Sequence, residues 1–439
     1  MAAAAAAGGA TGATDPSGSA PSWERYLLSL EVFGMRPGLE RVSALLDRLG
    51  RPERSFRAIH VVGTNGKSST TRYAAAILAA HGRRAGAYLS PHITGFCERV
   101  LVDGRAVAGG RFAAAVETVR TACGGLAADL GPVTQFEVLT VAAFLALARE
   151  GVEAAAVEAG LGGRLDATNV LEAPVVVLTT VGLEHTEVLG DTREAVFAEK
   201  AAVIKGGDAV FGRLEGLEAR AEEVCAAVGA RPHFLDGDVT VAGQPAAFEV
   251  TVSGSRYDGL SLPTPAAYQT ANAALAVAAC HFLLGALDAV AVPRGLRDCT
   301  VPGRLQVVGE RPLTLADGAH NPDGVVALVD SLAAIARPRP RVGLLAILRD
   351  KGVGEMVALL APLFDHVVCT ACREPRSLSA AELAGVVAAT APRADVRVLE
   401  DPKAALAAGR ELAGRDGSLV VTGSLYLLAD LAWLVGDGG

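Results

Sequence analysis

The sequence has no long apolar run and no excess of positive charge. Its hydrophobic stretches are interrupted by charges or glycines well before the ~20 residues that a membrane span needs. The net charge is −8, from 40 basic and 48 acidic side chains, which argues against a general nucleic-acid or membrane-surface binder. We therefore expect its partners to be small molecules, with no nucleic acid and no membrane among them.

Cysteine is also scarce. The seven cysteines are an odd number spread thinly from Cys97 to Cys372, so they imply no disulfide framework, and we expect a cytoplasmic protein. Cys369 and Cys372 have the spacing of a redox or zinc pair, but no second pair or histidine cluster accompanies them. We interpret them as residues at the end of a strand.

The first 22 residues lack the basic region and apolar core of a signal peptide. Alanine, glycine, serine and proline dominate this segment, which predicts a disordered tail over residues 1–22. The whole chain has 439 residues, 51% of them hydrophobic, which is too many for one ordinary core. We expect two domains, or three.

From about residue 23, short apolar runs alternate with helical patterns. The runs "RAIHVV", "RAGAYLS", "VEAAAVEAG" and "APVVVLTTVG" predict strands, and "SSTTRYAAAILAAHG" and "TQFEVLTVAAFLALAREG" predict helices. Continuous apolar strands are typical of a parallel sheet that is buried on both faces. Such a fold binds its nucleotide at the carboxyl ends of the strands.

Residues 232–262 change character and predict short antiparallel strands on the same domain. A helix returns in "YQTANAALAVAACHFLLGA", and a second strand–helix series follows "VPGRLQVVGERP". We place the domain boundary between residues 298 and 305. The prediction is an α/β protein with a P-loop ATPase-type parallel-sheet domain over residues 23–300 and a smaller Rossmann-like α/β domain over residues 301–439.

The stretch "IHVVGTNGKSSTTR" has the order of a phosphate loop, in which backbone N–H groups and a helix N-terminus hold anionic oxygens. The usual spacing G-x-x-x-x-G-K-[ST] requires glycine at position 61, where Val61 stands. Gly63 and Gly66 bracket a shorter loop. The spacing alone leaves open a damaged site, a chance match, or a different class of nucleotide enzyme.

Lysine is rare enough to be informative. Only five of the 40 basic residues are lysines, so this chain uses arginine wherever a general positive charge serves. A compact ammonium fits a phosphate loop, and a neutral amine can react covalently, whereas a guanidinium does neither. The lysines inside motif-like segments are Lys67, Lys200 and Lys351.

Two further residues follow predicted buried strands. Glu158 precedes a glycine-rich segment, and a carboxylate at a strand end beside a phosphate loop is a natural Mg²⁺ ligand, with a capping or surface glutamate as the alternative. His185 ends the next strand segment, where it either reaches a second ion or is structural.

Eight motifs occur in order: "GTNGKS" from Gly63, "SPH" from Ser90, Glu98-Arg99, "EAGLGGRLDATN", "GLEHTEVLG", "EKAAVIK", "PGR" at 302–304 and "DGAHNP" at 317–322. Together they resemble the folylpolyglutamate synthase/dihydrofolate synthase branch of the Mur ligase superfamily. The resemblance covers roughly residues 23–430. The short loop is then the form typical of this family rather than a defect.

The resemblance implies an ATP-dependent ligase of folate biosynthesis and one-carbon metabolism. Such an enzyme adds L-glutamate to dihydropteroate, to reduced folylpolyglutamate, or to both, through an acyl phosphate. The implied cofactors are ATP and two Mg²⁺ ions, and the implied catalytic residues are Lys67, His185 and Lys200. Lys200 matches a carbamylated lysine of the family, with a helix-surface lysine as the alternative. The implied metal ligands are Ser68, Ser90, Glu158, His185 and Lys200.

The resemblance also implies binding sites for the nucleotide and the folate-like substrate. Asp350-Lys351 matches a segment that faces the cleft, and Asp317 has the alternative of capping the following helix. Tyr268 and Gly352 depart from the usual family pattern. The nucleotide set is Gly63, Thr64, Asn65, Gly66, Lys67, Ser68, Asn272, Arg304, Asp317 and His320. The substrate set is Thr134, Phe136, Glu137, Asp166 and Ala167, with the loop "FGMRPG" at 33–38.

Ligands on both domains imply closure around ATP, and the family suggests a monomer. The alternative functions are a Mur-type ligase acting on another carboxylate, such as a cell-wall precursor, and a P-loop NTPase switch. The order of the motifs and the lack of a nucleotide-sugar-binding domain ahead of residue 23 disfavour the first. The switch leaves "PGR" and "DGAHNP" unexplained, and a non-catalytic binding protein would not need Lys67, Glu158 and Lys200 together.

Overall fold

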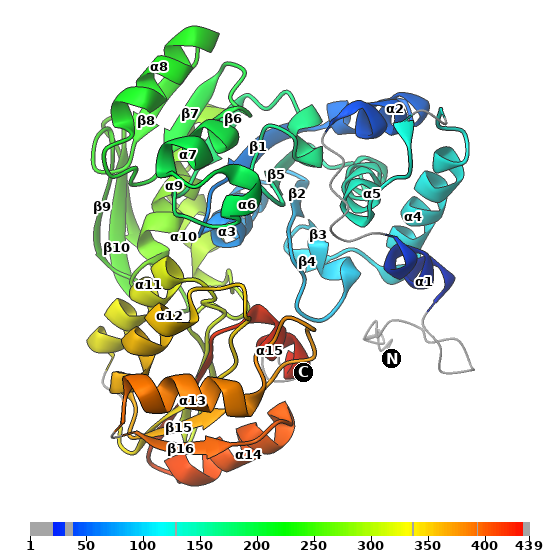
Figure 1. Ribbon diagram of the computed structural model, residues 1–439. Helices are drawn as coiled ribbons and strands as arrows, with labels where there is room; N and C mark the ends of the chain where they lie inside the picture. The colour runs from blue at the N-terminus through cyan, green and yellow to red at the C-terminus, as the bar shows by residue number, and fades with distance from the viewer. Residues whose placement is uncertain (1–20, 31–37, 128–129, 336–337, 393, 433–439) are drawn as a thin grey trace, which may run out of the picture.

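The chain forms two α/β halves, which lie one above the other in Figure 1, with the N-terminal half on top. The computed structural model describes residues 21–30, 38–127, 130–335, 338–392 and 394–432. Most of the predicted tail lies outside the described residues, and helix α1 begins at Ser22. The described residues contain no helix that is long and apolar enough to span a membrane.

A single eight-stranded sheet organises the N-terminal half. Its strands are β1 (Arg57–Val62), β2 (Ala85–Tyr88), β3 (Val100–Val102), β4 (Arg105–Ala106), β5 (Ala154–Glu158), β6 (Val175–Leu178), β7 (Asp208–Phe211) and β8 (Arg231–Phe234). The order is β4-β3-β2-β5-β1-β6-β7-β8, and every pair from β2 to β8 is parallel. Strands β3 and β4 continue the sheet in antiparallel fashion. The carboxyl ends of β5, β1 and β6 therefore meet in the middle of one sheet edge.

Helices cover both faces of this sheet, as the continuous apolar strands predict. The helices are α1 (Ser22–Ser29), α2 (Glu40–Arg48), α3 (Lys67–Ala80), α4 (Gly109–Cys123), α5 (Gln135–Arg149), α6 (Thr186–Leu189), α7 (Arg193–Ala201), α8 (Glu218–Val228), α9 (Gln269–Leu284) and α10 (Ala291–Arg297), with 3₁₀ turns η1 (Pro52–Ser55), η2 (Phe96–Arg99) and η4 (Ala167–Val170). Ala154 and Ala156 of β5 face α3 and α9, whereas Ala155 and Val157 face α4 and α5.

The predicted antiparallel strands form a separate three-stranded sheet. They are β9 (Val239–Gln244), β10 (Ala247–Val252) and β11 (Ser255–Leu260), in the order β11-β10-β9. Val250 and Leu260 are buried in the same hydrophobic core as α9 and β1. This small sheet is therefore part of the N-terminal half, as expected.

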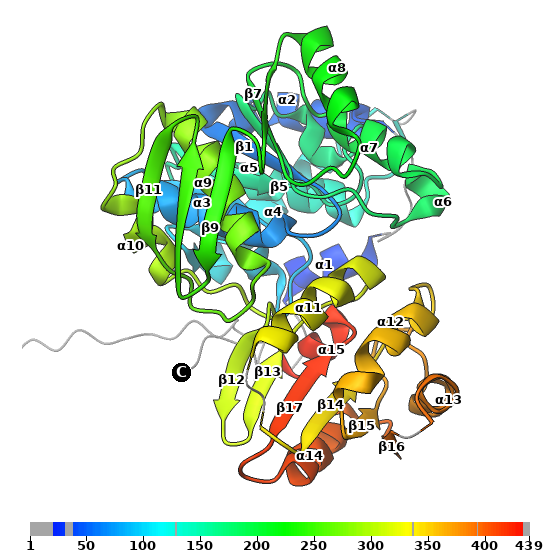
Figure 2. The same cartoon turned by 90° about the vertical axis from the view of Figure 1, so that its left-hand side faces the viewer.

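The C-terminal half has its own six-stranded sheet, whose strands lie side by side in the lower part of Figure 2. Its elements are β12 (Gln306–Glu310), β13 (Leu313–Ala316), α11 (Pro322–Ala334), β14 (Arg341–Leu345), α12 (Val353–Leu360), η5 (Ala361–Leu363), β15 (His366–Cys369), α13 (Ala380–Thr390), β16 (Asp395–Val398), α14 (Pro402–Ala413), β17 (Ser418–Thr422) and α15 (Leu425–Asp430). The order is β12-β13-β17-β14-β15-β16. All pairs are parallel except β12 with β13. Helices α11, α12 and α13 pack on one face, and α14 and α15 pack on the other.

The mixed α/β class is confirmed, and the second strand–helix series is present as the six-stranded sheet and its helices. Strand β12 was not predicted as a separate element. Cys369 ends β15, and both it and Cys372 are buried and free, as expected of strand-end residues. The predicted boundary falls between α10 and β12, and we propose that the two domains divide there.

Candidate active site

The predicted phosphate loop is a strand–loop–helix unit at the centre of the large sheet. It runs from the end of β1 to the start of α3. Gly63 has a φ of +145° and Gly66 a φ of +90°, which L side chains rarely adopt. A Cβ at Gly63 would overlap Thr179 Oγ1, and one at Gly66 would overlap Asn272 Oδ1. Both positions therefore require glycine, and the short loop is well formed.

The segment that follows β6 holds the phosphate loop through hydrogen bonds. Thr64 Oγ1 accepts from the Gly182 N–H at 3.0 Å, and the Asn65 N–H donates to Thr180 Oγ1 at 2.9 Å. Lys67 Nζ donates to the carbonyls of Gly63 (3.0 Å) and Thr64 (3.1 Å). These bonds fix the loop backbone, so its N–H groups at the helix N-terminus are preorganised for an anion.

Ser68, Ser90 and Glu158 come together, as the prediction requires. Glu158 ends β5 and is 1% exposed. The Ser68 hydroxyl donates to Oε1 at 2.9 Å, and the Ser90 N–H donates to Oε2 at 3.1 Å. Burial raises the pKa of Glu158, and the nearby Lys67 charge and these hydrogen bonds offset only part of that rise. A buried carboxylate that accepts from the Ser68 hydroxyl and the Ser90 N–H beside a phosphate loop lies in a setting that suits a hard cation.

Lys200 reaches the phosphate loop from helix α7. Its side chain is buried, and its Nζ donates to the Gly63 carbonyl at 2.9 Å. Burial, and then the neighbouring Lys67 charge, lower the pKa of Lys200 to about 7. The alternative of a helix-surface lysine is wrong, because the amine is enclosed beneath the loop and is largely neutral near physiological pH.

His185 lies in the segment that follows β6, with a positive φ of 52°. Its Nε2 is 3.6 Å from Glu184 Oε1 and its Nδ1 is 3.8 Å from Glu187 Oε1. Burial lowers the pKa of His185, and Glu184 opposes that effect. The ring is therefore mainly neutral at pH 7, which is the form that binds a metal.

Sequence reasoning missed Glu184, which joins the two halves. Its Oε1 accepts from Lys351 Nζ at 2.9 Å and lies 3.5 Å from His320 Nε2. Burial alone would raise the pKa of Glu184, but the hydrogen bond and charge of His320, together with Lys351, hold it well below its usual value. The available signal was an acidic residue next to His185 inside the "GLEHTEVLG" motif.

The nucleotide residues predicted in the C-terminal half are organised around Asp317. Its carboxylate accepts from Tyr268 Oη (2.8 Å) and from the N–H groups of Leu305 (2.7 Å) and Ala319 (2.8 Å). Burial raises the pKa of Asp317, and the Arg304 charge opposes that rise. The alternative that Asp317 caps the following helix is wrong, because Asn321 caps α11.

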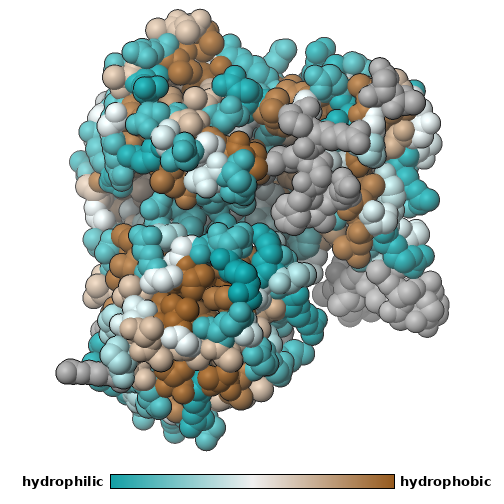
Figure 3. All heavy atoms as spheres, viewed as in Figure 1, coloured by the Kyte–Doolittle hydropathy of each residue, from teal (hydrophilic) through white to brown (hydrophobic). Residues whose placement is uncertain are grey.

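The two halves also meet at the loop itself. Asn65 and Asn321 exchange two amide hydrogen bonds of 3.2 Å. Asn272 of α9 packs against Gly66, and His320 Nδ1 lies 2.8 Å from the Gly318 carbonyl. The structure thus brings the predicted nucleotide residues of both halves to one boundary, where hydrophilic side chains predominate on the face shown in Figure 3.

The predicted substrate residues divide into two groups. Thr134 and Glu137 form a capping box at the start of α5, and the buried Glu137 also pairs with Arg41 at 2.8 Å. Asp166 accepts from the N–H groups of Leu161 (2.8 Å) and Thr168 (3.0 Å), and its burial raises its pKa. The carboxylates of Glu137 and Asp166 thus have partners within the fold, and their substrate role stays a prediction.

Phe136 lies closer to the candidate active site. Its half-buried ring covers Gly160, two residues after Glu158, and is stacked with Tyr88 at 6.2 Å. Ala167 is buried. Of the predicted loop at 33–38, residues 33–37 lie outside the described residues.

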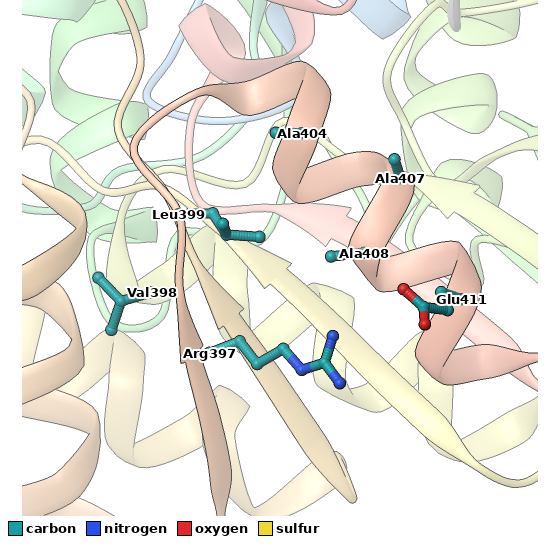
Figure 4. A pocket seen from close by; sticks show the side chains of 7 residues that line it. All are labelled: Arg397, Val398, Leu399, Ala404, Ala407, Ala408 and Glu411. Carbon is teal, nitrogen blue, oxygen red and sulfur yellow. The ribbon is translucent and has the colours of Figure 1, made fainter.

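A small pocket lies between the halves beside Ser68. It is lined by Ser68, Arg72, Leu89, Pro91, Ile93, Glu98, Val301, Pro302, Arg304 and Leu425. A second, open hollow lies between β16 and α14 (Figure 4), and none of its lining residues belongs to the predicted site. Within the described ranges, no three His, Cys, Asp or Glu side chains form a group that could hold a metal alone. A metal here would need serine oxygens and nucleotide phosphates as well, which fits the chemistry of Mg²⁺.

Comparisons with known proteins agree with this geometry. The family model "Mur ligase middle domain" matches residues 61–280, and "Mur ligase, glutamate ligase domain" matches residues 303–425. A Mycobacterium tuberculosis protein named dihydrofolate synthase/folylpolyglutamate synthase is 37% identical over 376 residues, covering 79% of this chain and 77% of that protein.

Solved structures resemble the whole described fold. Mycobacterium tuberculosis folylpolyglutamate synthase, solved as a complex with ADP, has a TM-score of 0.89 and 33% identity, covering 94% of this chain and 97% of that one. A bifunctional folylpolyglutamate synthase/dihydrofolate synthase from Yersinia pestis, complexed with AMPPNP and a Mn ion, has a TM-score of 0.83 and 31% identity. That similarity covers 93% of this chain and 96% of the Yersinia chain.

Proposed function

The chain belongs to the folylpolyglutamate synthase/dihydrofolate synthase family of the Mur ligases, and from this membership we propose the reaction that it catalyses. It uses ATP to join L-glutamate to the carboxylate of dihydropteroate, of reduced folylpolyglutamate, or of both, through an acyl phosphate. The observation that carries the proposal is the group of Ser68, Ser90 and Glu158 at the end of a preorganised phosphate loop.

The chemical need for ATP follows from the acceptor. A carboxylate at pH 7 is a poor electrophile, and its phosphorylation installs a good leaving group that the amine of glutamate can displace. The loop N–H groups and Lys67 stabilise negative charge on the transferred phosphoryl group. Arg304, whose charge also acts on the buried Glu158, brings a second cation from the C-terminal half.

We further propose two Mg²⁺ ions at this site. Ser68, Ser90 and Glu158 would hold the first, and His185 with Glu158 and a carbamylated Lys200 would hold the second. When bound, the ions would neutralise charge that develops on the phosphates during transfer. The oxygen donors around the buried Glu158 support the first site, and the neutral imidazole of His185 supports the second.

The proposed carbamate depends on the state of the Lys200 amine. A neutral amine attacks CO₂, forms an N–C bond and releases a proton, which leaves an anionic carbamate. The lowered pKa of Lys200 supplies the neutral amine, and its enclosure beneath Gly63 protects the product from bulk water. Arginine cannot replace it, because a guanidinium does not deprotonate.

The nucleotide set and the substrate set complete the proposal. The residues that would contact ATP across the boundary between the halves are Asn272, Arg304, Asp317 and His320. Contacts such as Glu184–Lys351 hold the halves together, so that water is excluded from the acyl phosphate. Phe136 would contact the aromatic part of the acceptor, and the position of its ring over Gly160 supports this role. We propose a cytoplasmic monomer.

The experiment that tests this function measures ADP release with each acceptor separately. The purified protein is incubated with ATP and Mg²⁺, with or without L-glutamate, and with dihydropteroate or tetrahydrofolate. We expect release that needs both glutamate and at least one acceptor, with a product one glutamyl residue heavier by mass spectrometry. Release that needs neither would favour a nucleotide switch and contradict the proposal.

A further inference from the structure

One short loop touches both the metal-site candidates and the C-terminal half. It belongs to the segment that connects β2 to β3, and it includes Ser90, whose N–H donates to Glu158 Oε2 at 3.1 Å. Three residues later, Ile93 packs into the apolar cluster of the C-terminal half. Both Ile93 and Leu428 approach the space above Gly303. The position of the C-terminal half is therefore linked to Glu158 through only a few residues of backbone.

The carboxylate of Glu98 accepts hydrogen bonds from two backbone N–H groups of the same loop. Its Oε2 accepts from the Ile93 N–H at 3.0 Å, and both of its oxygens accept from the Thr94 N–H, at 2.9 and 3.1 Å. A carboxylate that accepts from backbone N–H groups makes charge-assisted hydrogen bonds, which are stronger than neutral ones. Glu98 thus fixes the residue that anchors the loop in the C-terminal half.

Arg99 fixes the other end of the same loop. Its Nε donates to His92 Nδ1 at 2.9 Å, and its carbonyl accepts from the Leu89 N–H at 2.8 Å. A guanidinium can only donate, so His92 Nδ1 is the acceptor in this contact. Ser90 lies between Leu89 and His92, which are both held in this way.

We propose that Glu98 is a positioning residue that holds the Ser90 loop between Glu158 and the C-terminal half, and so sets the affinity for a divalent cation with its nucleotide. The proposal rests on the proposed function, because it treats Ser90 as part of the metal site. Glu98 also lines the small pocket beside Ser68 and Arg304. Its role gives the Glu98-Arg99 motif a physical explanation, since neither residue is needed as a direct metal ligand.

The test compares Glu98→Ala with Glu117→Ala, a matched change on α4, where the side chain is 43% exposed and pairs with Arg120 on the same helix. Binding of Mn²⁺ in the presence of AMPPNP is measured by electron paramagnetic resonance, without turnover. Loss of outer-shell support typically weakens metal binding by about 10–100-fold, so we expect at least about a tenfold loss in Glu98→Ala and none in Glu117→Ala. Glu98→Gln keeps one carbonyl acceptor and should bind with intermediate affinity.

A second variant tests the link to the C-terminal half and remains informative if Glu98→Ala does not fold. Ile93→Ala removes the apolar side chain that anchors the loop but keeps the backbone N–H that donates to Glu98. It should weaken Mn²⁺ binding several-fold while its melting curve stays cooperative. Wild-type affinity in folded Glu98→Ala, or in both Glu98→Gln and Ile93→Ala, would overturn the inference. Failure of the wild type to bind Mn²⁺ with AMPPNP would instead refute the proposed metal site itself.

Discussion

The environment of Lys200 gives a prediction that separates a reactive amine from a structural one. Its pKa is lowered from 10.5 to about 7. At pH 7.5 about three quarters of this amine is then neutral, against about one part in a thousand for an ordinary lysine. The amine is therefore several hundred times more available to CO₂ than an exposed lysine would be.

We expect Lys200→Ala to lose at least about 99% of ligase activity and to recover part of it with added acetate or formate, which supplies the missing carboxylate. Lys200→Arg should be equally inactive, because it keeps the positive charge but cannot form a carbamate. Lys403→Ala, on the exposed surface of α14, is the matched control and should keep wild-type activity.

A second measurement, by ¹³C NMR, detects the carbamate directly and shows how its formation depends on pH. With ¹³C-bicarbonate, the wild type should show a protein-bound carbamate signal in ¹³C NMR that grows as the pH rises through about 7, and Lys200→Ala should show none. Full activity in Lys200→Ala, or an identical signal in both proteins, would show that Lys200 does not carry a functional carbamate.

The same pKa shift predicts how stability changes with pH. Between pH 7 and 10.5 the unfolded chain binds the Lys200 proton more tightly than the folded chain does. The penalty for burying this amine is therefore present below pH 7 and is relieved as the pH rises through that window. Lys200→Met should accordingly raise the melting temperature more at pH 7 than at pH 9.5, and an equal gain at both values would contradict the assignment.

Three other substitutions test the remaining parts of the site. Glu158→Gln should raise the melting temperature, because it removes a buried charge, yet reduce ligation at least about 100-fold; a melting temperature below that of the wild type would contradict this. Gly66→Ala places a Cβ against Asn272 at a φ of +90°, so it should lower the unfolding free energy by about 1–3 kcal/mol. It should also weaken AMPPNP binding in calorimetry, whereas wild-type binding would show that the loop adapts. Glu184→Gln leaves Lys351 without its ionised partner, so it should lower the unfolding free energy by roughly 1–3 kcal/mol, and an unchanged value would mean that the pair contributes nothing to holding the halves together.

The parts of the site that are local in sequence could be predicted. The order of strand, glycine loop and helix placed Lys67 and Ser68, and the carboxyl end of a buried strand placed Glu158, because parallel strands end at the same edge. The scarcity of lysine singled out Lys200, which is buried and hydrogen-bonded, and Lys351, which is partly buried and ion-paired.

The contacts between the halves could not be predicted from residue patterns. Glu184 and Lys351 are 167 residues apart, and no periodicity or motif spacing reports such a pairing. Tyr268 departs from the family pattern, and its hydroxyl donates a hydrogen bond to the Asp317 carboxylate. These interactions depend on how two separate sheets meet, which local sequence does not specify.

Two helix starts carry capping signals that are local in the sequence. "TQFE" has the spacing of a capping box, and the structure uses Thr134 and Glu137 in that way. Asn321 before Pro322 is a typical helix start, and Asn321 caps α11, whereas the residue-based alternative put the cap at Asp317. Capping chemistry therefore accounts for the observed hydrogen bonds at both helix starts.

In the proposed reaction, ATP activates the acceptor by transferring a phosphoryl group to its carboxylate. Dihydropteroate labelled with ¹⁸O in that carboxylate tests it directly, with the released phosphate analysed by ³¹P NMR or mass spectrometry. The account predicts that one labelled oxygen appears in inorganic phosphate for each glutamate joined. Ligated product without label in the phosphate would show that the carboxylate is activated in another way.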